Sequence, residues 1–267
     1  MLGALQNGTR VEADVAERGQ AFNCPGCRQA VILKRGKIVT AHFAHKPPVS
    51  CILALGETPF HLLAKKVFQQ SFSERGFAAY AEWEVLSVVG DRRADVLVQG
   101  LHPRYPVAFE IQHQSIDQSM IEHRTQAYMA ANIPVIWLGL LKPEALREAT
   151  PTPAGFLVPR YSVRPWEKWV HAFGFKTIWF LDPHARELWQ GTMKEHRIEV
   201  PVSTWYEADG EEQSAGGYTR SSKRWRELHL SGPVPLSEIR VRVAYRKPWS
   251  VPAMSLPGGI SAQIEYP

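Results

Sequence analysis

The sequence lacks long hydrophobic runs and the signatures of several large enzyme classes. Its longest apolar stretch, residues 133–141, is too short to cross a bilayer, and no basic start followed by an apolar region opens the chain. It contains no phosphate-cradling glycine loop, no HExxH helix and no GxSxG elbow. We therefore expect a cytoplasmic protein with no membrane partner. Nucleotide hydrolysis, zinc proteolysis and serine esterase chemistry have no support in the sequence.

Cysteine is also scarce, with three residues in a chain of 267, all between positions 24 and 51. An odd number cannot be fully paired in disulfides, and such clustering in a reducing compartment favours metal binding. The remaining composition, with 45% hydrophobic and 10% aromatic residues, is sufficient for a buried core.

The three cysteines have the spacing of a zinc module. Cys24 and Cys27 form a Cys-x-x-Cys turn, which places two thiolates on one side of an ion. We expect Cys51 and one histidine of the HFAH string to complete a tetrahedral site, with His45 favoured over His42, and a hairpin at residues 31–39 between the two halves. A closed site of this kind would hold structural zinc. The alternative is three free cysteines without a metal.

Residues 56–141 carry the densest regular pattern. Apolar residues at helical spacing follow Thr58 and Pro59, which suit the start of a helix. Strand patterns at 81–89 and 93–99 flank a Gly-Asp turn, and alternation predicts a third strand at 106–112. The SIDQ string at 115–118 has capping-box spacing and predicts a second helix to about residue 131, followed by a buried strand from 133.

This order of helix, three strands, helix and strand (αβββαβ) matches the restriction-endonuclease-like core. We therefore predict an α/β fold with that core at residues 56–141, a zinc-binding module at 1–55 and a mixed, mostly β accessory region at 142–267. In the last region, the TPTP string at 150–153 is typical of a linker. We expect a short helix around Trp166 and Trp169, a strand-turn-strand pattern at 178–189 and a loop at 207–217.

Two acidic residues interrupt apolar strand patterns. Asp95 is flanked by apolar residues, and Glu110 lies between Phe109 and Ile111, with Gln112 on the same strand face as Glu110. An unpaired carboxylate is costly to bury, so each acid is expected to have a partner. If the two strands are neighbours, the side chains meet and could hold magnesium or manganese beside a phosphodiester. The alternative is two carboxylates at strand edges that face water.

Basic residues gather near the C-terminal end of a chain whose formal net charge is +5. Within residues 218–248 they include Arg220, Lys223, Arg224 and Arg226, against only two acidic residues. This pattern is typical of a surface that contacts phosphates, although a solvated strand face would look the same.

Five strings, FNCPGC, AHFAH followed by Cys51, GETPFHLLAK, RADVL and FEIQ, resemble the competence protein CoiA family in their order and distances. The resemblance covers roughly residues 20–140. It implies a PD-(D/E)XK nuclease-like domain that acts on DNA, single-stranded in particular, during transformation or recombination. Recombination proteins are further partners that it suggests.

Carried over by position, the resemblance places the superfamily's metal-binding acids on Asp95 and Glu110 and its lysine position on Gln112. The acid of the first helix falls on Glu57, and the following histidine on His61. An amide at position 112 can only form hydrogen bonds, whereas lysine would add positive charge near the reacting phosphate. In the second helix, Gln114, Gln118, Arg124 and Tyr128 resemble the phosphate or supporting groups of some of these nucleases. Arg93 could contact a phosphate or pair with Asp95.

Two functions remain from different classes. In the first, the protein is a magnesium- or manganese-dependent deoxyribonuclease. In the second, it binds DNA or a recombination partner and cuts nothing, and the acids are structural.

Overall fold

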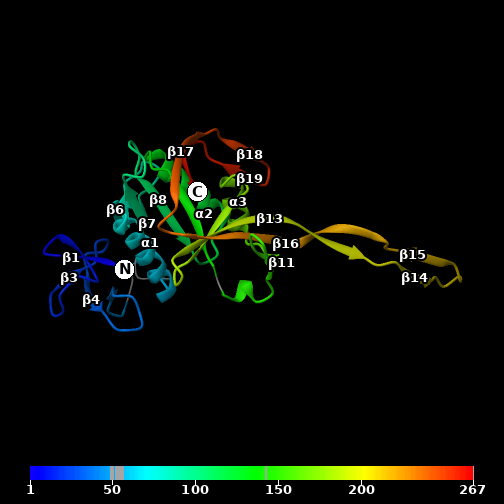
Figure 1. The fold of residues 1–267 in the computed structure, drawn as a ribbon, viewed down its shortest axis with the longest axis horizontal. Coiled ribbons are helices and arrows are strands. Elements are labelled where there is room, and N and C mark those ends of the chain that lie inside the picture. The colour runs from blue at the N-terminus through cyan, green and yellow to red at the C-terminus, as the bar shows by residue number, and fades with distance from the viewer. Residues whose placement is uncertain (49–50, 52–56, 142, 267) are drawn as a thin grey trace.

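The computed structural model describes residues 1–48, 51, 57–141 and 143–266. These residues form a mixed α/β fold, as predicted, and strands predominate in it. A small N-terminal sheet packs beside helix α1, a nine-stranded sheet runs through the main body, and a long hairpin projects from it (Figure 1). Among the described residues, no helix is long and apolar enough to cross a membrane.

The N-terminal module is a five-stranded antiparallel sheet in the order β2-β1-β3-β4-β5. Its strands are β1 (Gly3–Gln6), β2 (Thr9–Glu12), β3 (Phe22–Asn23), β4 (Ala30–Lys34) and β5 (His42–His45). The hairpin predicted at 31–39 extends further, because β4 pairs with β5 and residues 35–41 form the connection.

Helix α1 (Pro59–Glu74) begins where the sequence predicted. The Thr58 hydroxyl oxygen accepts a hydrogen bond from the His61 backbone N–H at 3.2 Å, and Pro59 needs no partner at the first helical position. Three strands follow, then a helix and a strand: β6 (Ala78–Val85), β7 (Arg92–Gln99), β8 (Val107–Gln112), α2 (Gln118–Ala130) and β9 (Val135–Leu140).

Two local predictions in this region differ from the structure. Strand β6 ends at Val85, so the hairpin connection is residues 86–91 rather than a two-residue turn. Helix α2 starts at Gln118 with Asp117 as its N-cap, so the predicted capping box at Ser115 is wrong. The Gln112 side chain donates to the Gln114 carbonyl oxygen at 2.6 Å, and the residues between β8 and α2 are not helical.

The nine-stranded sheet has the order β10-β11-β16-β13-β12-β9-β8-β7-β6. Strands β8, β9 and β12 are parallel, and the other neighbours are antiparallel. The C-terminal region contributes η2 (Pro143–Leu146), β10 (Thr150–Thr152), β11 (Gly155–Ser162), α3 (Pro165–Phe173), β12 (Ile178–Asp182), β13 (Glu187–Val200) and β16 (Tyr218–Pro235). The sheet therefore continues across the residue 141/142 boundary.

The TPTP segment is not a linker. Thr150, Pro151 and Thr152 form β10 and pair with β11 at the edge of the sheet. An edge strand tolerates proline because its outer side needs no backbone donor. The helix near Trp166 and the strand-turn-strand at 178–189 are confirmed as α3 and as the antiparallel pair β12–β13.

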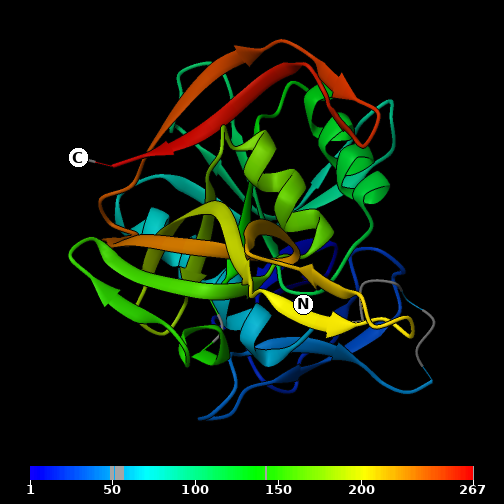
Figure 2. The same cartoon turned by 90° about the vertical axis from the view of Figure 1, so that its right-hand side faces the viewer.

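Each face of the large sheet has its own apolar core. Helix α1 and the hairpin β17 (Arg240–Arg246) with β20 (Gly259–Glu265) cover one face, where Phe68, Phe72 and Phe109 are fully buried. Helices α2 and α3 cover the other, where Trp166 and Trp169 are buried, and the short hairpin β18 (Trp249–Val251) with β19 (Met254–Leu256) contacts α3. Figure 2 shows β17 and β20 arching over the molecule in orange and red.

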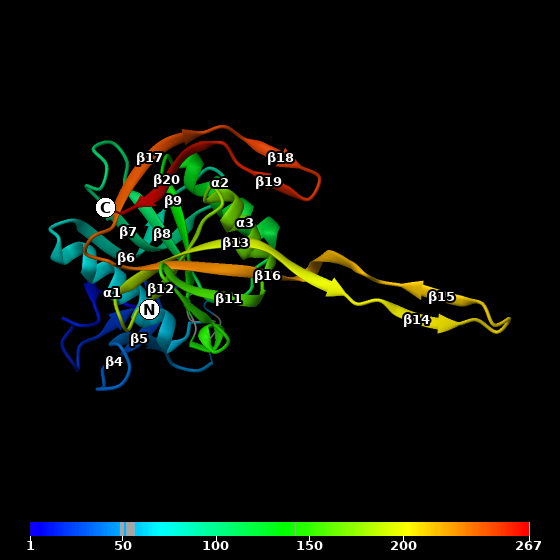
Figure 3. The ribbon, with the colours of Figure 1, turned by 45° about the vertical axis from the view of Figure 1, so that its right-hand side comes forward.

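Strands β13 and β16 extend beyond the body as a hairpin arm, residues 194–226 (Figure 3). Its outer part contains β14 (Ser203–Tyr206) paired with β15 (Glu212–Ala215), so the loop expected at 207–217 is partly strand. Residues 201–212 are all exposed, which means that no core stabilises the tip.

Candidate functional site

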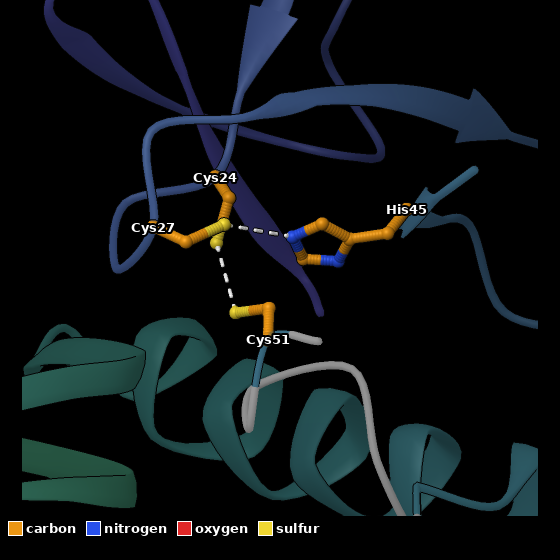
Figure 4. A group of neighbouring side chains, drawn as sticks. All are labelled: Cys24, Cys27, His45 and Cys51. Atoms are coloured by element: carbon orange, nitrogen blue, oxygen red, sulfur yellow. Dashed lines mark hydrogen bonds between the residues drawn. The ribbon is translucent and has the colours of Figure 1, made fainter. Parts of the chain in front are cut away.

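A cluster of sulfur and nitrogen ligands lies between the N-terminal module and α1 (Figure 4). Cys24 and Cys27 come from one turn, His45 from the end of β5, and Cys51 from the segment that leads towards α1. The Cys24 and Cys51 Sγ atoms are 3.9 Å apart, and the Cys27 Sγ is 3.2 Å from the His45 Nε2. All four ligand atoms lie within 4.8 Å of one another.

The turn between the two cysteines is fixed by its backbone. The Cys24 N–H donates to the Gln29 carbonyl at 2.8 Å, and the Arg28 N–H donates to the Cys24 carbonyl at 3.0 Å. A backbone hydrogen bond at Gln29 lowers the pKa of the Cys27 thiol to about 7, whereas burial raises the pKa of Cys24. Cys27 is therefore readily available as a thiolate, the form that binds metal.

These four residues fit a closed tetrahedral metal site. Thiolate sulfurs about 2.3 Å from a zinc ion stand about 3.8 Å from each other, close to the observed Cys24–Cys51 separation. His45 belongs to the cluster, whereas the alternate ligand His42 has its Nδ1 2.9 Å from the Thr40 carbonyl oxygen. The structure thus places a group that could hold a structural metal at the four predicted residues.

Asp95 lies in β7, at the point where β7 separates from β8. The pairing of these strands ends at Val96 opposite Phe109, and the Asp95 Oδ2 accepts a hydrogen bond from the Ile111 N–H at 2.8 Å. The same oxygen lies 3.3 Å from the His61 Nε2 of α1. Asp95 therefore connects the first helix to the strand that carries Glu110.

Strand β6 is irregular beside Asp95. Its register with β7 passes from Ala81 opposite Val96 to Trp83 opposite Ala94, and Glu82 between them has a φ of 53°. Ala94 packs in the core on the α2 side, whereas Val96 packs in the core on the α1 side. Asp95 is thus where side chains change faces, which allows its carboxylate to reach the Ile111 N–H.

A buried ionic network continues from Asp95 along α1. The His61 Nδ1 is 3.6 Å from a Glu57 oxygen, and the Lys65 ammonium group contacts both Glu57 and, at 2.6 Å, Glu82. Glu57 and His61 were predicted from the sequence, whereas Lys65 and Glu82 were not. The four-residue spacing of Glu57, His61 and Lys65, which places them along one side of a helix, was the available signal for Lys65.

The network sets the charge states around Asp95. Burial opposes charge on His61, but the carboxylate of Asp95 raises the pKa of this histidine to about 9. Burial would raise the pKa of Asp95, yet the neighbouring His61 charge holds it below its usual value. The pair is therefore an imidazolium beside a carboxylate at neutral pH.

Glu110, in β8, is 1% exposed and is held from α2. The Arg124 Nη2 donates to its Oε2, and the Tyr128 hydroxyl donates to its Oε1, both at 2.5 Å. The Arg124 guanidinium also stacks over the Trp137 ring at 5.0 Å. Burial raises the pKa of Glu110 despite the Arg124 charge, and the Asp95 charge raises it further. Both oxygens of Glu110 thus already have a protein partner.

The structure brings Asp95 and Glu110 to the same end of neighbouring strands, but holds them differently. Asp95 is bound from α1, through His61, and Glu110 from α2. Among the described residues, Cys24, Cys27, His45 and Cys51 form a group of at least three potential metal ligands, and neither Asp95 nor Glu110 belongs to such a group.

The other predicted site residues lie nearby or on the arm. Gln112 is the last residue of β8, and Arg93 of β7 lies opposite Glu84. Burial would raise the pKa of Glu82, but the charges of Lys65 and then Arg93 lower it below its usual value. The four basic residues predicted near the C-terminal end all lie on β16, where Arg220, Lys223 and Arg224 are exposed and Arg226 donates to the Ser222 carbonyl oxygen.

Two family models match the chain in consecutive segments. Residues 5–54 match the model for "Competence protein CoiA, N-terminal domain", and residues 57–151 match the model for "Competence protein CoiA, nuclease-like domain". Together the matched segments span more than half of the 267 residues. No curated protein and no solved structure gives a significant match.

Proposed function

Because the chain belongs to the competence protein CoiA family, we propose that it is a metal-dependent deoxyribonuclease of the PD-(D/E)XK superfamily. The family supports a competence-related role in DNA processing. The finer proposal is that residues 56–141 are a restriction-endonuclease-like core that hydrolyses phosphodiester bonds during transformation and recombination. Residues 1–55 and 142–267 would be a zinc module and an accessory region, and recombination proteins would be further partners.

One observation carries the proposal. Asp95 and Glu110 lie at the end of the β7–β8 pairing, and Asp95 binds the backbone of the residue that follows Glu110. Carboxylate oxygens are the ligands that hard divalent cations prefer. Each carboxylate oxygen has two lone pairs, so the hydrogen bonds to Arg124 and Tyr128 do not use up the acceptor capacity of Glu110. The donor set therefore suits magnesium or manganese.

Each residue of the site has a distinct role in this proposal. Asp95 and Glu110 would hold the ion, which supplies a Lewis acid for the phosphodiester and its attacking water. His61 keeps Asp95 ionised, and Glu57 orients His61. Gln112 would orient the water by hydrogen bonding, since an amide brings no charge. Arg93 and Arg124 would contact phosphates, and Arg124 would have to share its bond to Glu110.

A structural zinc ion in the cluster of Cys24, Cys27, His45 and Cys51 completes the proposal. A site with four protein ligands leaves no position for substrate, so zinc would stabilise the module rather than take part in hydrolysis. The exposed basic residues of β16, Arg220, Lys223 and Arg224, with Arg226, would hold a single DNA strand through its phosphates.

The test is cleavage of labelled single- and double-stranded DNA by the full chain with magnesium or manganese. We expect Asp95→Asn and Glu110→Gln each to lower the cleavage rate by at least about a hundredfold, because a metal contributes several kcal/mol of transition-state stabilisation. Glu84→Gln is the matched control, since this acid is exposed on the neighbouring strand β6 and should retain wild-type activity.

A second candidate function is a DNA-binding mediator that cuts nothing. It is favoured by the hydrogen bonds that occupy both oxygens of Glu110 and by the absence of a lysine at position 112. Metal-independent DNA binding without cleavage under any divalent cation would favour this function. Cleavage that survives Asp95→Asn would contradict the proposed catalytic site.

A further inference from the structure

A cleft of about 600 Å³ lies beside the end of β8. It is lined by Gln112 and His113, by residues 139–141 at the end of the parallel strand β9, and by residues of β11, the start of α3 and β16. In open α/β sheets, ligands bind outside the carboxyl ends of parallel strands. The volume is also within the range of small-ligand sites, about 300–1,000 Å³.

The cleft has aromatic walls. Tyr161, Trp166, Phe180 and Trp225 line it, and Trp225 is half-buried. Gly139 leaves room in the cleft, because a Cβ there would stand 2.7 Å from the Phe180 ring. Surfaces of this kind bind flat rings, and stacking of a base on an aromatic side chain does not depend on which base it is.

A buried hydrogen-bond donor in this wall lacks an acceptor. Trp166 is 1% exposed, and within the described part of the chain its indole N–H has no hydrogen-bond partner. Buried polar groups are usually paired, so an unsatisfied donor in a cleft points to a ligand that brings the acceptor. The ring nitrogens and carbonyl oxygens of a nucleobase are such acceptors.

The charges of the cleft suit a neutral ligand better than a free phosphate. Three arginines and three glutamates line it: Glu144, Arg147, Glu148, Arg160, Arg164 and Glu167. Glu167 already accepts hydrogen bonds from the Tyr161 hydroxyl and the Arg164 N–H. Equal numbers of each sign give little attraction for a bare anion, but they supply donors and acceptors for a ring that has both.

The cleft lies next to the proposed catalytic site. Gln112 lies two residues after Glu110 on β8, and the His113 ring stacks on His61 with centroids 4.2 Å apart. His61 in turn contacts Asp95. On β16, the guanidinium of Arg224 stacks on Trp225 at 4.4 Å, so the basic residues of the arm begin at the rim.

We propose that this cleft holds one unstacked base of a single DNA strand whose backbone passes Asp95 and Glu110. The inference rests on the proposed function, because it supplies the substrate for the same site. A base within a duplex is paired and stacked, and it would have to leave the helix to enter a cleft of this kind. The cleft therefore selects single-stranded over double-stranded DNA.

The experiment compares two oligonucleotides of equal length and charge by fluorescence anisotropy with the full chain and no divalent metal. One is a thymidine 12-mer, and the other is a 12-mer of abasic sites. We expect the wild type to bind the thymidine strand about tenfold more tightly, which is a typical effect of stacking one base. Phosphate contacts are the same in both strands and cancel in the ratio.

Variants locate the base. Trp225→Ala should bring the ratio close to one, and Trp225→Phe, which keeps a ring, should restore most of it. Trp205→Ala is the control, because Trp205 is an exposed aromatic residue on the arm, outside the cleft. Circular dichroism and thermal unfolding verify that each variant is folded.

A wild-type ratio of one, or a ratio that Trp225→Ala leaves unchanged, would overturn the inference. An equal loss in Trp205→Ala would do so as well, because it would move the base contact to the arm. These outcomes are independent of cleavage. If the protein cleaves DNA but does not prefer the thymidine strand, the proposed function stands and the base site is ruled out. If it prefers the thymidine strand but does not cleave DNA, the base site stands and belongs to a DNA-binding mediator.

Discussion

Lys65 is 1% exposed, and its ammonium group is held between the carboxylates of Glu57 and Glu82. Burial lowers the pKa of a lysine, but the charges of Glu82, Asp95 and Glu57 raise it above its usual value. Lys65 is therefore charged, and it balances the negative charge around the proposed catalytic acid.

Removing this charge should be costly. We expect Lys65→Met to lower the free energy of unfolding by about 3–5 kcal/mol, because the buried Glu82 loses its cation and Glu57 keeps only its ion pairs with the N-terminus and His61. Lys66→Met is the matched control, since Lys66 pairs with the exposed Asp14 and surface pairs contribute about 0–1 kcal/mol. Urea unfolding measures both values, and equal effects of the two substitutions would contradict this role of Lys65.

The two histidines of the HFAH string allow a direct test of the zinc site. We expect the purified protein to contain one equivalent of zinc, His45→Ala to lose most of it, and His42→Ala to retain it, because only His45 lies in the cluster. Metal analysis after dialysis measures the content. Zinc-free wild-type protein, or equal losses in the two variants, would rule out this ligand set.

At the residue scale, the sequence predicted the residues whose spacing along the chain indicates a shared site. Cys24, Cys27, His45 and Cys51 are brought together, as the Cys-x-x-Cys turn and the following ligands indicated. The partners of Glu110 were harder to infer. Arg124 and Tyr128 were suggested only through a family resemblance, because which residues of α2 face β8 depends on how the helix crosses the sheet. Glu82 was missed because its φ of 53° breaks the strand alternation.

At the element scale, α3 is tied to the base of the arm through a histidine. The Met193 N–H of β13 donates to the His171 Nε2 at 3.2 Å, so this nitrogen must be unprotonated. Burial lowers the pKa of His171 below its usual value, although a backbone hydrogen bond at Lys176 partly opposes this shift. The unfolded chain therefore binds a proton more readily at this position than the folded protein does.

The sign of the pH dependence follows. The contribution of His171 is fully present above its unfolded pKa of about 6.5 and is lost as the pH falls through the lower folded value. We expect the wild type to lose stability between pH 7.5 and pH 5 more steeply than His171→Asn. Thermal unfolding across this range measures the slopes. His184→Asn, at an exposed turn, should keep the wild-type slope, and a His171→Asn slope equal to it would contradict the prediction.

Elements with an apolar pattern of their own were predictable, and those defined by distant partners were not. Helix α1 and strands β7 and β8 follow the apolar periodicity of their own sequence. Strand β10 and the strands β14 and β15 of the outer arm have no buried face, so the strand character of β10 comes from pairing with β11, and that of β14 and β15 comes from pairing with each other. Local sequence patterns do not report such pairing.

At the scale of the whole molecule, the arm carries its charges away from the core. We expect replacement of Arg220, Lys223, Arg224 and Arg226 by glutamine to weaken binding of single-stranded DNA. The slope of log affinity against log salt should become shallower by about two to three, because counterions are no longer released at the phosphates that these residues would contact. Lys168→Gln with Lys176→Gln, which changes exposed lysines near α3, is the control. An unchanged slope in the fourfold variant would mean that the arm does not contact phosphates.

The large sheet was the least predictable feature of the molecule. Its nine strands come from residues on both sides of position 142, and β12 lies next to β9 although η2, the two strands β10 and β11, and α3 separate them in the chain. The C-terminal third was predicted to be an accessory region, because the sequence offers no signal for which strand edge an added strand will occupy.

The neighbouring position of β9 and β12 limits how the protein can be dissected. A fragment that ends at residue 151, where the second family match stops, would leave the β9 edge without its partner. Open edges of this kind recruit strands from other chains and promote aggregation. Inactivity of such a fragment would therefore not test the roles of Asp95 and Glu110. A substitution in β12 could likewise abolish activity without changing either acid.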